Sequence, residues 1–486
     1  MTKFCSILLT ALALFITAAD GQTSIKRIVT ETLLMEVNRQ PQSVLVSPDG
    51  RHIGLVVRQN KKAALVINGI AGPSFDEIIE NPDEFAFPFS KTGPKFSPNS
   101  KRYAYIAVVG AKNCLVVDGK CGELYDEITT FGFSSDSRHF YYVAKTNTIV
   151  DVKGKKTSTS SERLYIDGQP LPDEVNRVRY GRLYDSLVDD FLVFEPNADR
   201  IAIVVTIDPA TGKEVANEGY RDAELWARIW DGKNLIPAGR SDLINFVFTP
   251  EQARVSKTWT STDGSSLVVD GKSDAPFWID GTVLFSADGN RHAYKALIRN
   301  KDRLGFAAVI DGKAGRAFNS VEEITFSPDG SHIAYVAGPE TGRARMVIDG
   351  VEGPIMYGVG RPVFDPVSGR LAFRASADYS RWRLFVDGTR LGPNYSFVSD
   401  PIFLTGTSHI AYGAGRDGKM FVVIDGTNEG REYSSIYPRR EIRSFGTPPA
   451  YYYVFCDRPN SFNYVAYRKD EVTKKGGIYL VEERVE

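Results

Sequence analysis

Two short motifs alternate along this chain, and their alternation restricts the possible fold more than any other feature of the sequence. The first motif is an apolar residue followed by Ser-Pro-Asp-Gly or a variant of it. It begins at nine positions: Val46, Phe96, Phe133, Phe194, Phe248, Phe285, Phe326, Phe364 and Phe403. The second motif is an apolar run that ends in Asp-Gly, or once in Asn-Gly. It ends at residues 68–69, 118–119, 167–168, 231–232, 270–271, 311–312, 349–350, 387–388 and 425–426. Strict alternation over most of the chain indicates an internal repeat.

One unit, residues 323–362, shows what each motif predicts. Its Ser-Pro-Asp-Gly segment, residues 327–330, is a turn, because Pro presets φ and Gly accepts positive φ. The apolar run 333–337 predicts a strand that is buried on both faces. Asp349 and Gly350 form a favoured two-residue hairpin turn after a third strand. We expect the fourth strand of the unit near residues 354–359.

Four antiparallel strands in about 40 residues, repeated along a chain, are typical of β-propeller blades. We therefore predict an all-β fold, a β-propeller of about nine to ten four-stranded units of roughly 38–50 residues each. A weaker tenth unit covers residues 451–481, and a strand at 25–37 could complete the last unit and close the ring. A single large ring and two smaller propellers both fit this pattern.

The repeat also resembles a known family. The run Phe-Ser-Pro-Asp-Gly at residues 326–330, followed by Ile-Ala-Tyr at 333–335, is similar to the TolB-type propeller repeat, a WD40-like family. The resemblance covers roughly residues 40–430 and implies an extracytoplasmic interaction scaffold. The chain differs from TolB itself, because the segment before its first repeat is too short for the N-terminal α/β domain of that protein.

The N-terminus has the pattern of a secretory signal peptide. Lys3 precedes an apolar stretch, residues 4–16, which is followed by small residues up to Gly21. We expect residues 1–21 to be a cleaved signal peptide and residues 22–486 to form the β-propeller repeat domain. The protein would then be periplasmic or secreted. We expect no membrane span after signal removal, because no later stretch approaches about 18 apolar residues.

Three cysteines remain after removal of the signal, which allows at most one internal disulfide. Cys114 and Cys121 flank the turn at residues 118–119. A two-residue loop would place them diagonally across two strands, about 7–8 Å apart. Disulfides prefer Cα separations below about 7 Å, so a bridge would need a shifted register or a wider loop. The alternative is two unlinked strand residues.

Two polar insertions interrupt the repeat, at residues 145–162 and 208–221. Both fall between the second and third strands of their units, so both should project from the same face of a propeller. Insertions that recur on one face can mark a binding face. They can equally be solvent-exposed loops.

The residue types that usually perform catalysis do not form a recognisable catalytic motif in this sequence. The five histidines share one repeat position, which predicts structural roles beside turns: His52, His139, His292, His332 and His409. The paired carboxylates also recur at one position, at 76–77, 126–127, 173–174 and 322–323. The chain has no Gly-x-Ser-x-Gly, His-Glu-x-x-His or paired Cys-x-x-Cys motif. We therefore assign no catalytic, cofactor-binding or metal-binding residues and expect no cofactor.

These observations favour a binding protein over an enzyme. We expect an exported β-propeller scaffold that binds a protein, peptide or glycan partner through one face. The alternative is a hydrolase or lyase that acts on an envelope or extracellular polymer from the central channel. A net charge of −1 argues against a nucleic-acid partner, which would require a basic surface.

Overall fold

The computed structural model describes residues 25–42, 44–80, 93–134, 136–152, 155–171, 192–194, 201–207, 224–230, 235–240, 244–248, 253–261, 264–269, 272–273, 277–279, 283–300, 303–339, 341–378, 380–441, 450–470 and 475–486. In these ranges the chain forms strands and turns and no helix. It follows that none of the described segments is a helix able to cross a membrane.

Each Asp-Gly or Asn-Gly pair of the second motif in the described ranges builds a tight turn and also ties that turn to a neighbouring strand. Asp349 and Gly350 have φ angles of 49° and 81°, the positive values that a type I′ hairpin turn requires. Oδ1 of Asp349 accepts a hydrogen bond of 2.9 Å from the backbone N–H of Ile333, where the second strand begins. The same bond is made by Asn68, Asp118, Asp167, Asp311, Asp387 and Asp425. The Asp or Asn side chain therefore fixes the turn against the strand beside it.

The Ser-Pro-Asp-Gly turns are stabilised by the serine hydroxyl. Ser327 donates a hydrogen bond of 2.5 Å to Oδ1 of Asp329 and accepts one of 2.9 Å from the backbone N–H of His332. Gly330 completes the turn with a φ of 71°. Equivalent serine bonds occur at Ser47, Ser97, Ser134 and Ser286. Both motifs thus act on the start of the second strand of each unit.

The described strands form ten antiparallel sheets of four or five strands and one sheet of two strands. The first sheet contains β2 (Leu45–Val46), β3 (Ile53–Gln59), β4 (Lys62–Ile67) and β5 (Ile70–Phe75). The second contains β6 (Glu77–Ile78), β7 (Lys95–Phe96), β8 (Tyr103–Val109), β9 (Lys112–Val117) and β10 (Lys120–Cys121). The third contains β11 (Glu127–Phe133), β12 (Phe140–Val152), β13 (Lys155–Ile166) and β14 (Gln169–Pro170).

The next four sheets continue in sequence order. The fourth contains β15 (Leu192–Phe194), β16 (Ile201–Ile207), β17 (Glu224–Trp230) and β18 (Leu235–Arg240), and the fifth β19 (Ile244–Phe248), β20 (Ala253–Ser261), β21 (Gly264–Val269) and β22 (Lys272–Ser273). The sixth contains β23 (Trp278–Ile279), β24 (Leu284–Phe285), β25 (His292–Asn300), β26 (Arg303–Ile310) and β27 (Lys313–Ala314). The seventh contains β28 (Ser320–Phe326), β29 (Ile333–Gly338), β30 (Arg345–Ile348) and β31 (Val351–Glu352).

The last three sheets follow in the same order, and the tenth also contains the N-terminal strand. The eighth contains β32 (Gly358–Val359), β33 (Val363–Phe364), β34 (Leu371–Ser376), β35 (Trp382–Val386) and β36 (Thr389–Tyr395). The ninth contains β37 (Phe397–Val398), β38 (Ile402–Phe403), β39 (Ile410–Arg416), β40 (Lys419–Ile424) and β41 (Asn428–Glu429). The tenth contains β42 (Ser435–Tyr437), β45 (Phe455–Arg458), β46 (Ser461–Lys469), β47 (Gly476–Val485) and β1 (Arg27–Val37), and the two-stranded sheet β43 (Arg439–Glu441) and β44 (Ala450–Tyr452).

The fourth strand of the unit at 323–362 is not where the sequence predicted it. The strand is β31, Val351–Glu352, because the two-residue turn at 349–350 returns the chain at once to pair with β30. Gly353 and Pro354 then end it, and the N–H of Gly353 bonds the carbonyl of Met346 at 2.9 Å. Residues 358–359 form β32, which begins the next sheet. The prediction of a strand at 354–359 was therefore wrong.

The N-terminal strand completes the last sheet, as the sequence predicted. β1 pairs with β47 in antiparallel register from Arg27↔Val485 to Val37↔Gly476. Val46 and Ile53 of the first sheet share a buried cluster with Tyr437 and Phe455 of the tenth. The two ends of the array are therefore packed against each other.

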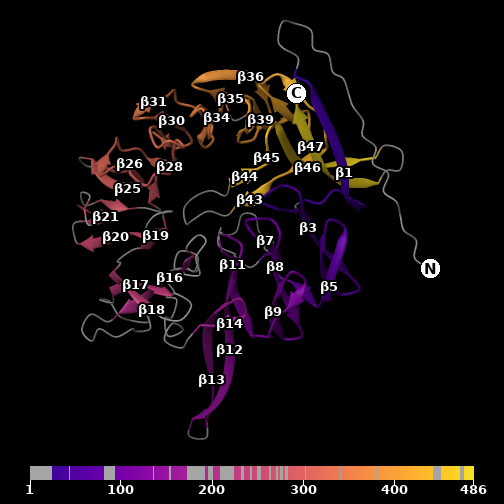
Figure 1. Cartoon of the computed structure of the whole chain (residues 1–486), viewed down its shortest axis with the longest axis vertical. Coiled ribbons are helices and arrows are strands. Elements are labelled where there is room, and N and C mark those ends of the chain that lie inside the picture. Colours follow the sequence, from indigo (N-terminus) through magenta and orange to yellow (C-terminus); the bar gives the residue numbers. More distant parts are fainter. Residues whose placement is uncertain are drawn as a thin grey trace.

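The sheets are arranged around one ring, and this architecture is a β-propeller. Figure 1 shows them following one another in sequence order, with the labelled first strands β11, β19 and β28 towards the middle. The yellow tenth sheet lies beside the indigo first sheet. Apolar side chains fill the space between neighbouring sheets, as Leu65 and Tyr105 do between the first and second. Of the two arrangements that fit the sequence, the structure has the single ring.

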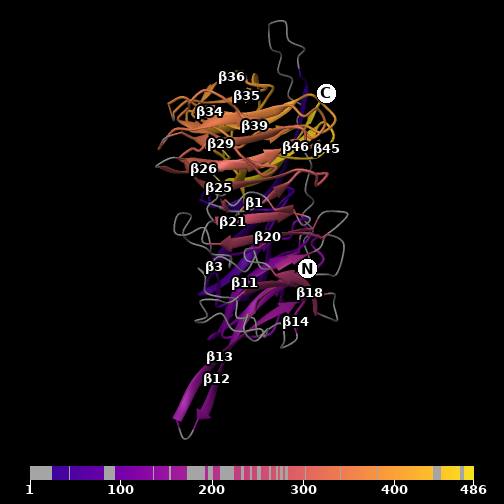
Figure 2. The same cartoon turned by 90° about the vertical axis from the view of Figure 1, so that its left-hand side faces the viewer.

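The insertion at residues 145–162 lengthens β12 and β13 into a two-stranded ribbon. The register runs from Thr146↔Ser161 to Val152↔Lys155, beyond the last residue that pairs with β11. The ribbon projects well away from the ring (Figures 1 and 2). The predicted second insertion, 208–221, lies outside the described residues.

Candidate functional site

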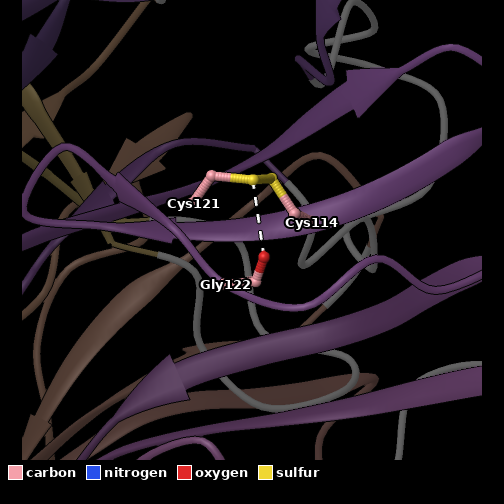
Figure 3. Close-up of a disulfide and its surroundings, with 3 residues drawn as sticks. All are labelled: Cys114, Cys121 and Gly122. Carbon is pink, nitrogen blue, oxygen red and sulfur yellow. Dashed lines mark hydrogen bonds between the residues drawn. A yellow bond between two sulfur atoms is a disulfide. The ribbon is translucent and has the colours of Figure 1, made fainter.

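A disulfide links Cys114 of β9 to Cys121 of β10, at the outer edge of the second sheet. Val117 pairs with Lys120 and Val116 with Cys121, so the loop has two residues and the register is the expected one. The two Cα atoms are nevertheless only 5.8 Å apart (Figure 3). Neighbouring strands twist, which makes the two diagonals of a cross-strand pair unequal. The expectation that a bridge would need a shifted register or a wider loop was therefore wrong.

A groove of about 420 Å³ lies beside this disulfide, between the second and third sheets. Its apolar lining comes from Leu115, Val117, Phe140 and Tyr142. Its charged lining comes from Arg102, Asp118, Lys120 and Glu123, and Cys121, Gly122 and Gly168 complete it. The disulfide ties Cys121 and the adjoining Gly122 of the lining to Cys114 in β9, and the carbonyl oxygen of Gly122 lies 3.6 Å from Sγ of Cys121 (Figure 3). The bridge thus fixes one wall of the groove.

Arg102 connects the two sheets at one end of the groove. Its Nε donates a hydrogen bond of 2.9 Å to Oδ2 of Asp118 in its own sheet. Its guanidinium lies 5.6 Å from the ring centre of Phe133 and 5.4 Å from that of Phe140, both in the third sheet. Cation–π contacts of this kind are stabilising when the cation is partly removed from water. They leave the half-buried ring of Phe140 in the lining of the groove.

A cluster of tyrosines supports the floor of the groove. Tyr142 stacks on Tyr165 with ring centres 4.7 Å apart, and Tyr125 lies 5.2 Å from Tyr165. The hydroxyls of Tyr125 and Tyr142 are 3.1 Å apart, and that of Tyr125 donates to Oε2 of Glu123 at 3.1 Å. Burial, together with the hydrogen bonds to Tyr142 and Tyr165, raises the pKa of Tyr125 well above its usual value. The stacked rings and hydrogen bonds of the cluster support Tyr142 in the lining of the groove.

An apolar floor with charged groups of both signs at its rim is the usual composition of a ligand site. The half-buried ring of Phe140 offers an aromatic surface to an apolar side chain or to a sugar ring. Asp118, Lys120 and Glu123 offer charges of both signs to polar groups around it. The lining of the groove thus offers apolar and charged contacts to a ligand, and it contains no nucleophilic side chain paired with a base.

The histidines lie beside turns in separate sheets. Nδ1 of His139 is 2.6 Å from Oδ2 of Asp167, the carboxylate that fixes the adjacent Asp-Gly turn. Equivalent contacts join His52 to Asn68, His332 to Asp349 and His409 to Asp425. Arginine takes the same place in the pairs Arg102–Asp118, Arg291–Asp311 and Arg370–Asp387. His292 lies one residue later, and its backbone N–H donates to Asp311.

The recurring carboxylates also make contacts within and between repeats. Asp76 accepts a hydrogen bond of 2.8 Å from the N–H of Gly110 and one of 2.7 Å from Nζ of Lys62. The Gly110 N–H and then the Lys62 ammonium lower the pKa of Asp76. Asp126 makes the equivalent bonds to the N–H of Asn147 and to Lys112. The pair at 173–174 lies outside the described residues, which contain no group of three or more His, Cys, Asp or Glu placed to hold a metal ion.

Sequence reasoning did not find the groove. Its residues come from two sheets, and although Asp118 and Gly168 belong to the Asp-Gly motif, that motif predicts a turn and not a groove. The two cysteines were the available signal, because they mark the edge strand that forms one wall.

Compared by sequence, the chain matches no protein-family model and no curated protein. Solved structures with a similar fold include a eukaryotic initiation factor, at 12% identity and a TM-score of 0.43, covering 79% of this chain and 96% of that one. The β-propeller domain of the trilobed protease from Pyrococcus furiosus has 14% identity and a TM-score of 0.29, covering 72% and 95%. TolB from Acinetobacter baumannii has 14% identity and a TM-score of 0.23, covering 60% and 80%.

Proposed function

We propose that this chain is an exported β-propeller scaffold that binds a protein, peptide or glycan partner. The groove between the second and third sheets is the observation that supports this proposal most directly. It combines an aromatic floor with charged groups of both signs, and the disulfide and the tyrosine cluster hold it in shape. A preformed site of this kind loses little entropy on binding.

Export also forms part of the proposal. Residues 1–21 have the pattern of a signal peptide, which would bring the chain to the periplasm or the outside of the cell. Disulfides persist in such oxidising compartments and are rare in the cytosol of most organisms. The Cys114–Cys121 bridge supports this location.

The test is a capture experiment with the mature chain, residues 22–486, against the envelope and secreted fractions of its host. Partners are identified by mass spectrometry, purified, and titrated against three proteins: wild type, Lys120→Glu and Lys313→Glu. Lys120 and Lys313 both follow an Asp-Gly turn and are both exposed, but only Lys120 lines the groove. We expect Lys120→Glu to weaken binding about tenfold, as loss of a charged contact does, and Lys313→Glu to leave it unchanged. Equal affinity of all three proteins would contradict the proposal.

A further inference from the structure

A group of arginines lies on the inner side of the ring, in sheets that do not contribute to the groove. Arg361 lies between β32 and β33 and Arg374 in β34, both in the eighth sheet. Asp400 lies between β37 and β38 of the ninth sheet. Arg361 and Asp400 both interrupt the first strand of their sheet, which corresponds to the strands β11, β19 and β28 that Figure 1 shows towards the middle of the ring. The three side chains therefore meet at the inner end of the junction between the two sheets.

Two guanidinium groups share the single carboxylate of Asp400. Nε of Arg374 donates to Oδ1 at 2.9 Å, and Nε of Arg361 lies 3.2 Å from Oδ2. The exposed fractions of the side chains are 28% for Arg374, 19% for Arg361 and 11% for Asp400. Partly desolvated charge that is not fully compensated is costly, and an additional anion would reduce that cost.

A third guanidinium approaches the same place from the two-stranded sheet. Nη1 of Arg361 donates a hydrogen bond of 2.8 Å to the hydroxyl of Tyr452 in β44. The guanidinium of Arg361 lies 4.5 Å from the centre of the Tyr452 ring, and that of Arg439 in β43 lies 4.7 Å from it. One tyrosine ring is thus in contact with two arginines from different sheets.

Arg361 and Arg374 are held in place but still have hydrogen-bond donors to offer, whereas Arg439 donates a hydrogen bond of 3.4 Å to the carbonyl of Pro48. The indole of Trp382 lies 4.9 Å from the Arg374 guanidinium, which also donates to the carbonyl of Val398 at 3.3 Å. Gly360 leaves room for the pair with Asp400, since a Cβ there would lie 2.5 Å from Arg374. Each guanidinium has five N–H donors. Among the described residues, Arg361 makes one hydrogen bond and Arg374 makes two, and Nε of Arg361 has no hydrogen-bond acceptor.

We propose that Arg361, Arg374 and Arg439 form a binding site for an anionic oxygen group, the carboxylate or phosphate of a ligand that reaches the inner side of the ring. Arginine is suited to this role, because its planar fork matches both groups and its charge persists at every physiological pH. Asp400 pairs with the two arginines of the eighth sheet and therefore competes with the ligand for them. This site is separate from the groove and adds a second ligand to the proposed scaffold.

The test is isothermal titration of the mature chain with inorganic phosphate and, separately, with galacturonate, at constant ionic strength in chloride buffer. We expect saturable binding of one anion per chain. Arg361→Gln and Arg374→Gln should each weaken it about tenfold or more, the usual effect of removing a charged hydrogen bond. Arg316→Gln is the matched control, because Arg316 also lies over an aromatic ring and pairs with a carboxylate, but at the exposed surface. Binding of phosphate but not of galacturonate would indicate that the natural ligand carries a phosphate group. Binding of both probes would indicate that the site also accepts carboxylates.

Asp400→Asn distinguishes anion binding from a purely structural role of the arginines. It removes the competing charge and leaves all three guanidinium groups, so anion affinity should rise about threefold or more. A folding defect would lower the affinity for the anion, so a rise in affinity cannot result from one. The Asp400→Asn variant therefore tests the proposal even if an arginine variant is unstable. The proposal is overturned if wild type binds neither probe, if both arginine variants bind as wild type does, or if Asp400→Asn weakens binding.

Discussion

Gly50 lies where the first and tenth sheets meet, and its lack of a side chain is required there. Its φ is 68°, and a Cβ would lie 2.2 Å from the ring of Phe455 and 2.8 Å from the amide of Asn463. The same turn position is Ser100 in the second sheet and Ser137 in the third, with φ of 63° and 64°. Their hydroxyls accept hydrogen bonds of 2.9 Å from backbone N–H groups of the preceding sheet. At this turn position, neighbouring sheets are therefore joined either by close packing against a glycine or by a hydrogen bond to a serine hydroxyl.

Gly50→Ala should lower the free energy of unfolding by about 3 kcal/mol, the sum of a left-handed backbone and an overpacked junction. Gly418→Ala is the control, because Gly418 has a φ of 73° but nothing within 4 Å of the added Cβ. We expect that control to cost about 1 kcal/mol, the backbone contribution alone. Chemical denaturation of the two variants measures the difference, and equal losses would show that the junction with Phe455 is not tightly packed.

The turn aspartates should make stability depend on pH in the acid range. The Ser327 hydroxyl, followed by Ser331, lowers the pKa of Asp329 from 3.8 to about 2. A carboxyl with a depressed pKa in the folded state stabilises the protein above its unfolded pKa, and this contribution is lost as pH falls towards the folded value. Asp329→Asn removes the titrating group, so its Tm should fall less than that of wild type between pH 5 and pH 2.5. Parallel Tm curves for the two proteins would contradict this origin of the acid sensitivity.

Among the elements, β1 has the largest effect on the architecture, because it closes the ring as the outer strand of the tenth sheet. Nε of Arg27 donates to Oε2 of Glu483 in β47 at 2.6 Å, and the hydroxyl of Tyr464 donates to Oε1 at 2.6 Å. The exposed fractions of the Arg27 and Glu483 side chains are 8% and 1%. Arg27 also donates to the carbonyl of Val422 in the ninth sheet at 3.1 Å. One buried residue of the first strand thus ties together the last two sheets.

Arg27→Ala should cost about 3–5 kcal/mol of unfolding free energy, because it leaves the buried Glu483 carboxylate without its cation. Lys26→Ala, which removes an exposed pair with Glu486, should cost less than about 1 kcal/mol. Urea denaturation of both variants gives the comparison. A loss in Arg27→Ala as small as that in Lys26→Ala would mean that the closing strand is not held by this pair.

The turns, the strands and the role of β1 could be predicted, because each depends on local residue types and a repeated pattern. The fourth strand at 351–352 was misplaced, because a two-residue strand leaves little pattern in the sequence. The disulfide geometry and the groove could not be predicted either. Strand twist sets the distance from Cys114 to Cys121, and the approach of two sheets brings Arg102 next to Phe140. Relations between sheets have no local signature in a single sequence.

In the whole molecule, neighbouring sheets support one another where the structure describes their side chains, because apolar clusters join the first sheet to the tenth, the second to the third and the eighth to the ninth. Closing the array into a ring gives the first and last sheets neighbours as well, which an open repeat array would lack. In the described part of the chain, three features differ from this regular arrangement of sheets. These are the groove beside the disulfide, the arginine group on the inner side and the projecting β12–β13 ribbon (Figure 2).

Partner binding at the groove is tested most directly by hydrogen–deuterium exchange, measured on residues 22–486 alone and with the captured partner bound. We predict slower exchange in the complex at residues 115–123 and 140–142, which line the groove. Residues 308–316 carry the same Asp-Gly motif in the sixth sheet and should exchange at the same rate in both states. Protection of 308–316, or unchanged exchange at 115–123, would contradict binding at the groove.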